Sequence, residues 1–205
     1  MELRAVFFDL DGVLINSSSA NLKLRQCFAS DFGYGTNIDI NLDTENTDDL
    51  IEHILTTYDS DIKCSDFQKY AEKNMKEYIQ NVVQNPDAKH LLDLLDAKGI
   101  LSAVVTNSES ALARKILEAK NLIPNILVGL DGQYRKKPAP DMIFRACELL
   151  GVPPWEIMYV GDSESDFHAA MAAGCLFVGF GISGNFTISK LMDVMDILAG
   201  AGPSN

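Results

Sequence analysis

The segment Ala5–Gly12 reads AVFFDLDG, an apolar run that ends in two aspartates and a glycine. A strand over Ala5–Leu10 would be continuously apolar up to Asp9, without alternation of polar residues. This pattern is typical of a strand buried on both faces of a parallel sheet. Ligands bind at the carboxyl ends of such strands, so the two acids mark the edge where a functional site is expected.

Further apolar runs of strand length alternate with amphipathic stretches along the chain. The expected strands are Ala5–Leu10, Leu101–Val105, Ile126–Val128, Ile157–Val160 and Leu176–Phe180. The expected helices are Asp87–Ala97, Glu109–Lys120, Asp141–Leu150, Glu164–Ala173 and Ile188–Leu198. This alternation predicts an α/β fold with a doubly wound, Rossmann-like parallel sheet.

One block interrupts the alternation, because residues 17–80 contain no convincing strand. Helices are expected there near Ser19–Asp31, Thr47–Thr57 and Ser65–Val82. We therefore expect an all-helical domain over 17–80, inserted into a core that is formed by residues 1–16 and 81–205.

The composition limits the classes of partner. The chain has 205 residues, is 47% hydrophobic and carries a formal net charge of −12. Such a field repels polyanions, so nucleic acid is not expected as a partner, and no apolar run approaches the roughly 20 residues of a membrane span. The four cysteines are scattered, as expected for reduced thiols in a cytoplasmic protein. We expect a monomer or a weak homodimer.

The two aspartates after the first strand are candidate metal ligands. Asp9 and Asp11 are two residues apart, so they face the same side of an extended segment. Two carboxylates this close repel each other, and a hard cation such as Mg²⁺ relieves that repulsion. The alternative is a strand end with two solvated acids.

Polar residues also follow the second strand and precede the helix at Asp141. Thr106-Asn107-Ser108 offers a hydroxyl and backbone N–H groups that suit an anion, although an ordinary helix N-cap would have the same residues. Lys137 is followed by Pro138 and Pro140, which stiffen the segment. A lysine held at a carboxylate site can neutralise a phosphoryl group. The alternative is a solvated basic loop, which we favour for Lys136.

The fourth strand ends in a further acidic cluster, Gly161-Asp162-Ser163-Glu164-Ser165-Asp166. Asp162 stands where the strand turns into a helix, a position suited to a metal ligand. Asp166 has a competing interpretation, because Ser163 and Asp166 have the spacing of a capping box. The clusters together offer carboxylates, a hydroxyl and a lysine at one sheet edge, a set that can hold Mg²⁺ and a phosphoryl group.

These motifs, in this order and spacing, resemble those of the haloacid dehalogenase superfamily, in its branch of phosphoglycolate phosphatases and β-phosphoglucomutases. The residues that carry the resemblance are Asp9-Leu10-Asp11-Gly12-Val13, Thr106-Asn107-Ser108, Lys137-Pro138-Ala139-Pro140-Asp141 and Gly161–Asp166. The resemblance covers the whole core, and the helical block stands where that branch inserts its cap domain.

The resemblance implies a role for each matching residue. Asp9 would be the nucleophile that forms an aspartyl phosphate, and Asp11 would protonate the leaving oxygen and then deprotonate water. Thr106 and the Asn107 backbone would bind the phosphoryl oxygens, and Lys137 would pair with them.

The resemblance also implies a Mg²⁺ site. Asp9 and Asp162 would be ligands, Asp11 would contribute its main-chain carbonyl, and Asp166 would support the shell of ligands. Asp11 argues against dehalogenation, because relatives that act on carbon–halogen bonds generally lack a second aspartate.

The resulting hypothesis is a Mg²⁺-dependent phosphatase that hydrolyses a small phosphorylated metabolite, a phosphomonoester, through an aspartyl phosphate. One alternative is a hexose phosphomutase that uses the same intermediate. Another is a non-catalytic phospho-aspartate switch protein, although receiver domains lack the helical insertion and the second aspartate.

Overall fold

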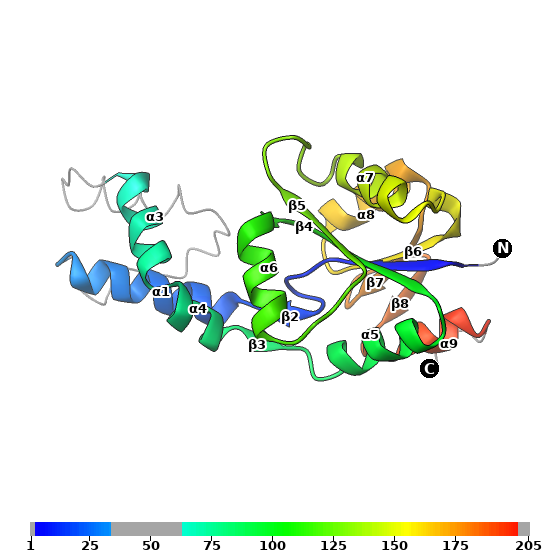
Figure 1. Ribbon diagram of the computed structural model, residues 1–205, viewed down its shortest axis with the longest axis horizontal. Helices are drawn as coiled ribbons and strands as arrows, with labels where there is room; N and C mark the ends of the chain where they lie inside the picture. The colour runs from blue at the N-terminus through cyan, green and yellow to red at the C-terminus, as the bar shows by residue number, and fades with distance from the viewer. Residues whose placement is uncertain (1–2, 34–62, 201–205) are drawn as a thin grey trace. The chain divides into compact units, whose positions relative to one another are not determined.

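The chain folds around a six-stranded parallel sheet flanked by helices (Figure 1). The computed structural model describes residues 3–33 and 63–200. The strand order is β5-β4-β1-β6-β7-β8, with β1 between the two halves of the sheet. The predicted α/β class with a doubly wound parallel sheet is confirmed.

Most strands of this sheet are buried in their middle sections. They are β1 (Ala5–Phe8), β4 (Leu101–Glu109), β5 (Ile126–Leu130), β6 (Ile157–Gly161), β7 (Leu176–Phe180) and β8 (Phe186–Ile188). All four residues of β1 are buried, and Phe8 pairs with Val104 on one side and with Val160 on the other. Since this register aligns the three strands, the residues after Phe8, Val105 and Val160 come together at one edge. The short strands β2 (Ile15–Asn16) and β3 (Val83–Gln84) form a separate sheet.

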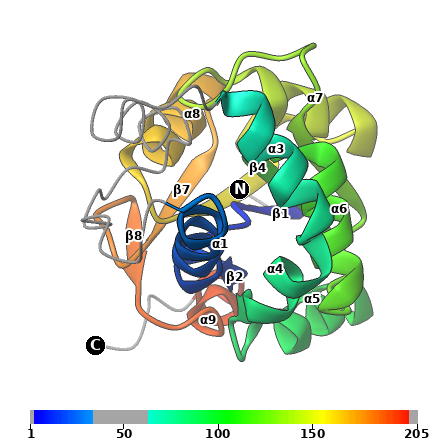
Figure 2. The ribbon, with the colours of Figure 1, turned by 90° about the vertical axis from the view of Figure 1, so that its left-hand side faces the viewer.

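Helices cover the core sheet on its two faces (Figures 1 and 2). They are α5 (Ala88–Ala97), α6 (Ser110–Ala119), α7 (Asp141–Leu150), α8 (Glu164–Ala173) and α9 (Asp193–Leu198), with a short 3₁₀ turn at Pro154–Glu156. The helices α7 and α8 pack on one face, where their apolar sides join alternate residues of the strands in a single buried cluster. The helices α5 and α9 lie on the opposite face (Figure 1).

The structure corrects the C-terminal part of the predicted pattern. Residues Phe186–Ile188 form a sixth strand of the sheet that the sequence analysis did not identify. Ile188 pairs with Phe180, so the helix expected over Ile188–Leu198 begins only at Asp193. A three-residue strand is too short to show periodicity, which is why its apolar residues resembled the start of a helix.

The second strand is also longer than expected, because β4 continues from Val105 to Glu109. The predicted helix over Glu109–Lys120 accordingly begins at Ser110. Glu109, and neither Thr106 nor Ser108, takes the N-cap position, so the interpretation of those two residues as helix caps is wrong.

Two compact units divide the chain, Met1–Asn16 with Gln84–Asn205, and Ser17–Val83. The described helices of the second unit are α1 (Ser18–Asp31), α3 (Cys64–Lys73) and α4 (Met75–Asn81). Phe28, Phe67 and Tyr70 pack there with ring centroids 5.0 and 5.3 Å from Phe28. The helix expected near Thr47–Thr57 lies outside the described residues.

The helix expected over Ser65–Val82 is interrupted at Asn74. Its side-chain amide donates to the carbonyl of Tyr70, four residues earlier, at 2.9 Å. An asparagine that bonds to nearby backbone in this way competes with regular helix geometry.

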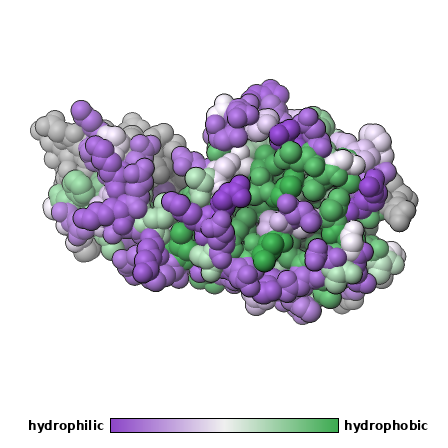
Figure 3. All heavy atoms as spheres, in the orientation of Figure 1, coloured by the Kyte–Doolittle hydropathy of each residue, from purple (hydrophilic) through white to green (hydrophobic). Residues whose placement is uncertain are grey.

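The surface of the sheet unit is not uniformly polar. On the face shown in Figure 3, hydrophobic side chains gather over the part of the core where β4 and β5 lie in Figure 1. Within the described ranges, no helix combines the length and the apolar character needed to cross a membrane.

Candidate active site

The candidate site begins where β1 ends. The backbone N–H of Asp9 still donates to Val160 O at 2.9 Å, so this residue remains tied to the sheet. The chain then folds back at once, because the N–H groups of Leu14 and Ile15 both donate to the carbonyl of Leu10. The carboxylates of Asp9 and Asp11 also accept hydrogen bonds from the following residues, Leu10 and Gly12, at 2.7 and 3.1 Å.

Gly12 permits this turn for two separate reasons. Its φ angle is +82°, in the left-handed region that disfavours side chains. A Cβ atom at this position would also overlap with the carboxylate of Asp162. The glycine therefore allows the backbone after β1 to approach the acid that follows β6.

The segment Thr106–Ser108 bulges away from its neighbouring strand. Val105 pairs with Val128 and Glu109 pairs with Leu130, so three residues of β4 face only Gly129 of β5. A side chain on Gly129 would collide with the backbone of Ser108 and Ser110. Thr106, which is buried, accepts a hydrogen bond from the Ser108 N–H at 3.1 Å. Bulges of this kind often re-aim backbone and side chains beside a site.

The loop that carries Lys137 is fixed at several points. The side chain of Asn107 accepts from the Lys137 N–H at 2.8 Å and donates to the Lys137 carbonyl at 3.2 Å. The guanidinium group of Arg135 donates two hydrogen bonds of 2.9 Å to the carboxylate of Asp141, in the first turn of α7. Both ends of the loop are therefore held by side chains, so the lysine is placed by its backbone.

The ammonium group of Lys137 is almost completely buried and lies between two carboxylates. Its Nζ is 2.8 Å from Asp9 Oδ1 and 2.6 Å from Asp166 Oδ1, and the lysine side chain is 2% exposed. It also donates to Val105 O and to the Tyr159 hydroxyl, each at 3.1 Å. The predicted lysine is thus at the carboxylate site, whereas Lys136 is exposed as expected.

A capping box at the start of α8 explains how Asp166 is aimed at this lysine. Ser163 Oγ accepts from the Asp166 N–H, and Asp166 Oδ2 accepts from the N–H and the hydroxyl of Ser163 at 3.2 and 2.6 Å. This leaves Asp166 Oδ1 for Lys137. The capping interpretation and the site interpretation of Asp166 are therefore compatible, because each uses a different carboxylate oxygen.

Three of the predicted acids form one cluster. Asp9, Asp162 and Asp166 each offer a carboxylate oxygen within 4.8 Å of the others. The carboxylate of Asp11 is not part of this group among the described residues. Three hard oxygen donors at this separation fit a Mg²⁺ ion, which prefers carboxylate ligands.

Burial dominates the electrostatics of the cluster. It raises the pKa of Asp9 to about 7, although Lys137 works in the opposite direction. Burial, together with the nearby Asp166, also raises the pKa of Asp162 to about 6. For Lys137, burial alone would lower the pKa, but Asp9 and Asp166 outweigh it and raise the pKa above the ordinary value. The site therefore holds more negative charge than one lysine offsets, which a divalent cation would relieve.

Two contributors to the site are not apparent from the sequence. Tyr159 belongs to an apolar strand, yet its hydroxyl contacts Lys137, Asp166 and Val105. Asn107 is expected to act through its backbone, yet its side chain holds the Lys137 loop. A tyrosine in the middle of a fully buried strand was the available signal, because a buried phenol needs a hydrogen-bond partner.

Known proteins resemble this chain in sequence and in fold. Residues 6–180 match the family model described as haloacid dehalogenase-like hydrolase. The chain belongs to the haloacid dehalogenase-like hydrolase family. This hydrolase is 30% identical to a phosphoglycolate phosphatase of Aquifex aeolicus over 182 residues, which cover 84% of this chain and 82% of the relative. It is 28% identical to the Escherichia coli K12 phosphoglycolate phosphatase, over 90% of this chain and 84% of the relative.

A solved structure also resembles this haloacid dehalogenase-like hydrolase. A candidate β-phosphoglucomutase from Thermotoga maritima superposes with a TM-score of 0.81 at 21% identity and covers 98% of this chain and 99% of its own. At that identity the likeness concerns the fold. The predicted family branch and the predicted class of enzyme, a phosphatase, are confirmed by the family match and the sequence relatives.

Proposed function

We propose that the protein is a Mg²⁺-dependent phosphatase that hydrolyses a small phosphomonoester through an aspartyl phosphate on Asp9. The observation that carries the proposal is the position of the Asp9 carboxylate. It is 2.8 Å from a buried lysine and belongs to a cluster of three acids at the carboxyl end of the sheet. A nucleophile, a fixed positive charge and donors for a cation are the parts that phosphoryl transfer needs.

In the first step, a carboxylate oxygen of Asp9 attacks the phosphorus atom. The bond from phosphorus to the alcohol oxygen breaks, and the carboxyl group of Asp11 gives its proton to that oxygen. In the second step, Asp11 takes a proton from water while the water oxygen attacks phosphorus. The bond to Asp9 then breaks, which restores its carboxylate and releases inorganic phosphate. Covalent catalysis of this kind divides one difficult displacement into two easier ones.

The groups around Asp9 would stabilise the negative charge on the phosphoryl oxygens. Lys137 supplies a positive charge that its contacts hold in place before substrate arrives, so little reorganisation is needed during reaction. The Thr106 hydroxyl accepts one hydrogen bond from Ser108, and its own proton can be donated to a phosphoryl oxygen. The backbone N–H of Asn107 would be a second donor.

Asp9, Asp162 and the main-chain carbonyl of Asp11 are the groups that would hold Mg²⁺ in this proposal. Asp166 would support them, since its two carboxylate oxygens already accept hydrogen bonds from Lys137, Tyr159 and Ser163. When bound, Mg²⁺ supplies positive charge that offsets both the carboxylates and the phosphoryl oxygens.

A panel of phosphate esters would test the proposal. It should contain 2-phosphoglycolate, because the relatives from Aquifex aeolicus and Escherichia coli are named phosphoglycolate phosphatases. Hexose phosphates and a generic chromogenic ester complete the panel. We expect release of inorganic phosphate that depends on Mg²⁺ and stops in a chelator. No release from any ester would count against the proposal. An isomerised sugar phosphate in excess of free phosphate would favour a phosphomutase, and a long-lived phosphoprotein without turnover would favour a switch.

Asp9→Asn tests the nucleophile directly. An amide of the same shape cannot form the acyl phosphate, so we expect no measurable turnover and an unchanged far-UV circular dichroism spectrum. The matched control is Asp96→Asn, an exposed position on α5, which should keep full activity. Activity of Asp9→Asn close to that of the control would remove Asp9 from this role.

A further inference from the structure

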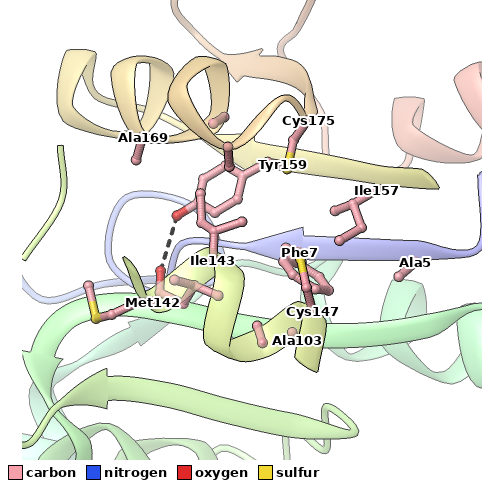
Figure 4. Packing of buried hydrophobic residues seen from close by; sticks show 14 of the residues in the cluster. Ala5, Phe7, Ala103, Met142, Ile143, Cys147, Ile157, Tyr159, Ala169 and Cys175 are labelled. Carbon is pink, nitrogen blue, oxygen red and sulfur yellow. Dashed lines mark hydrogen bonds between the residues drawn. The ribbon is translucent and has the colours of Figure 1, made fainter. Parts of the chain in front are cut away.

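A tyrosine in the centre of the sheet takes part in the same network as the site lysine. Tyr159 lies in β6, and its side chain is fully buried among the apolar residues between the sheet and α7 and α8. Figure 4 shows its ring within this packing and its hydroxyl directed toward the backbone of β4, where Val105 O lies 3.1 Å from the hydroxyl oxygen. Burial raises the pKa of this phenol well above its ordinary value, so the hydroxyl keeps its proton.

The tyrosine hydroxyl is one of four acceptors around the Lys137 ammonium group. Two acceptors are the carboxylates of Asp9 and Asp166, and two are neutral, Val105 O and the Tyr159 hydroxyl, each 3.1 Å from Nζ. An ammonium group has three protons, so these contacts share them. The neutral acceptors lie on β4 and β6, the two strands that flank β1, and therefore limit how far Nζ can move across the sheet edge.

The same hydroxyl also contacts the partner of that lysine, because it lies 3.0 Å from Asp166 Oδ1. One rigid side chain thus touches both members of the Lys137–Asp166 ion pair. The aromatic ring, which stacks on Phe177 at 6.4 Å between centroids, leaves the hydroxyl little freedom.

We propose that Tyr159 is a positioning residue, whose hydroxyl holds Lys137 and Asp166 so that the ammonium group faces Asp9. It does not touch the reacting atoms and acts through Lys137. The part of this proposal that concerns catalysis rests on the proposed phosphatase function, whereas the placement of Lys137 does not depend on it.

Tyr159→Phe removes only the hydroxyl and keeps the ring. Its expected effect is a fall in kcat of about 10- to 100-fold, since a displacement of about 1 Å at a reacting centre can cost about 10²-fold. KM for the ester should change much less, because the lysine stabilises the transition state more than it stabilises the bound substrate. In a Lys137→Met background the same substitution should lower kcat no further, because the group through which it acts is already gone.

Two controls separate positioning from packing. Leu95→Ala opens a cavity under α5, on the opposite face of the sheet, and leaves the packing around Tyr159 intact, so it should lower the melting temperature without the fall in kcat. Tyr134→Phe removes a hydroxyl from another tyrosine that packs against the same core, and it should leave kcat unchanged. An equal loss of kcat in Leu95→Ala and Tyr159→Phe would overturn the proposal.

A crystal structure of Tyr159→Phe gives a readout that does not depend on activity. We expect Nζ of Lys137 to move from its position 2.8 Å from Asp9 Oδ1 by more than about 0.5 Å, the tolerance of a pre-organised site. An unmoved lysine overturns the positioning role even if the wild-type enzyme is an active phosphatase. A displaced lysine in a protein that releases no phosphate supports the positioning and contradicts only the proposed function.

Discussion

Replacement of Lys137 by methionine tests how the buried charges are balanced. At about 2.7 Å and an effective dielectric constant near 20, each contact of Nζ with a carboxylate corresponds to roughly 6 kcal/mol of gross attraction. Desolvation of the three ions cancels most of that sum. Removal of one partner from a buried ion pair costs about 3–5 kcal/mol, because the remaining charge is left buried without compensation.

The expected loss for Lys137→Met is therefore about 3–5 kcal/mol in the free energy of unfolding. For a chain of this size it corresponds to a melting temperature lower by roughly 6–20 °C. Urea unfolding with EDTA present measures the first quantity without a contribution from metal binding. If Lys137 also offsets charge on the phosphoryl group, kcat should fall by about 10²–10³-fold, the usual effect of removing one such donor.

Lys136→Met is the matched control, because it removes the same type of charge from the neighbouring, exposed position. Surface substitutions of this kind usually change stability by less than about 0.5 kcal/mol. If Lys137→Met unfolds at the same urea concentration as Lys136→Met, the argument from buried charge is wrong. If its kcat also equals that of the control, Lys137 has no part in the chemistry.

Two other predictions concern the cation and the turn that supports its site. Mg²⁺ at about 100 times its dissociation constant should stabilise the protein by about 2.7 kcal/mol, and Asp162→Asn should abolish this gain while Asp96→Asn retains it in a thermal shift assay; an equal shift in both variants would remove Asp162 from the site. Gly132→Ala should lower the free energy of unfolding by about 1–2 kcal/mol, because this glycine has a φ of +84° and a Cβ there would meet open space. Gly12→Ala, at a φ of +82°, should lower the free energy of unfolding further and should also weaken the stabilisation by Mg²⁺, since its methyl group overlaps with Asp162. Identical behaviour of the two variants would contradict this reasoning.

Much of the core could be predicted because its strands are short apolar runs, and because two of them, β1 and β6, are followed by acids. The sequence does not reveal β8 or the correct start of α9, because only the three residues Phe186–Ile188 could have indicated a strand there. Residues Thr106–Ser108 resembled a helix start because sequence alone does not reveal that a strand has bulged past Gly129.

The site was predictable at the level of residue types but not of contacts. The motif spacing indicated that Asp9, Lys137 and Asp162 lie at one edge, and the structure brings them there. The motif spacing could not indicate that the two oxygens of Asp166 have different partners, or that a tyrosine in a hydrophobic strand contacts the lysine. Both depend on side-chain direction, which arises from packing between segments distant in the chain.

The central position of β1 has a consequence for how this chain is made. Ala5 pairs with Leu101 on one side and with Ile157 on the other, so its second partner is synthesised 152 residues later. At about 5–20 residues per second, the apolar first strand waits roughly 8–30 s on the ribosome before it can be enclosed. Such long-range pairings slow folding and leave hydrophobic surface open to association. A nascent chain that stalls before β6 would therefore have both an uncovered centre and no complete site.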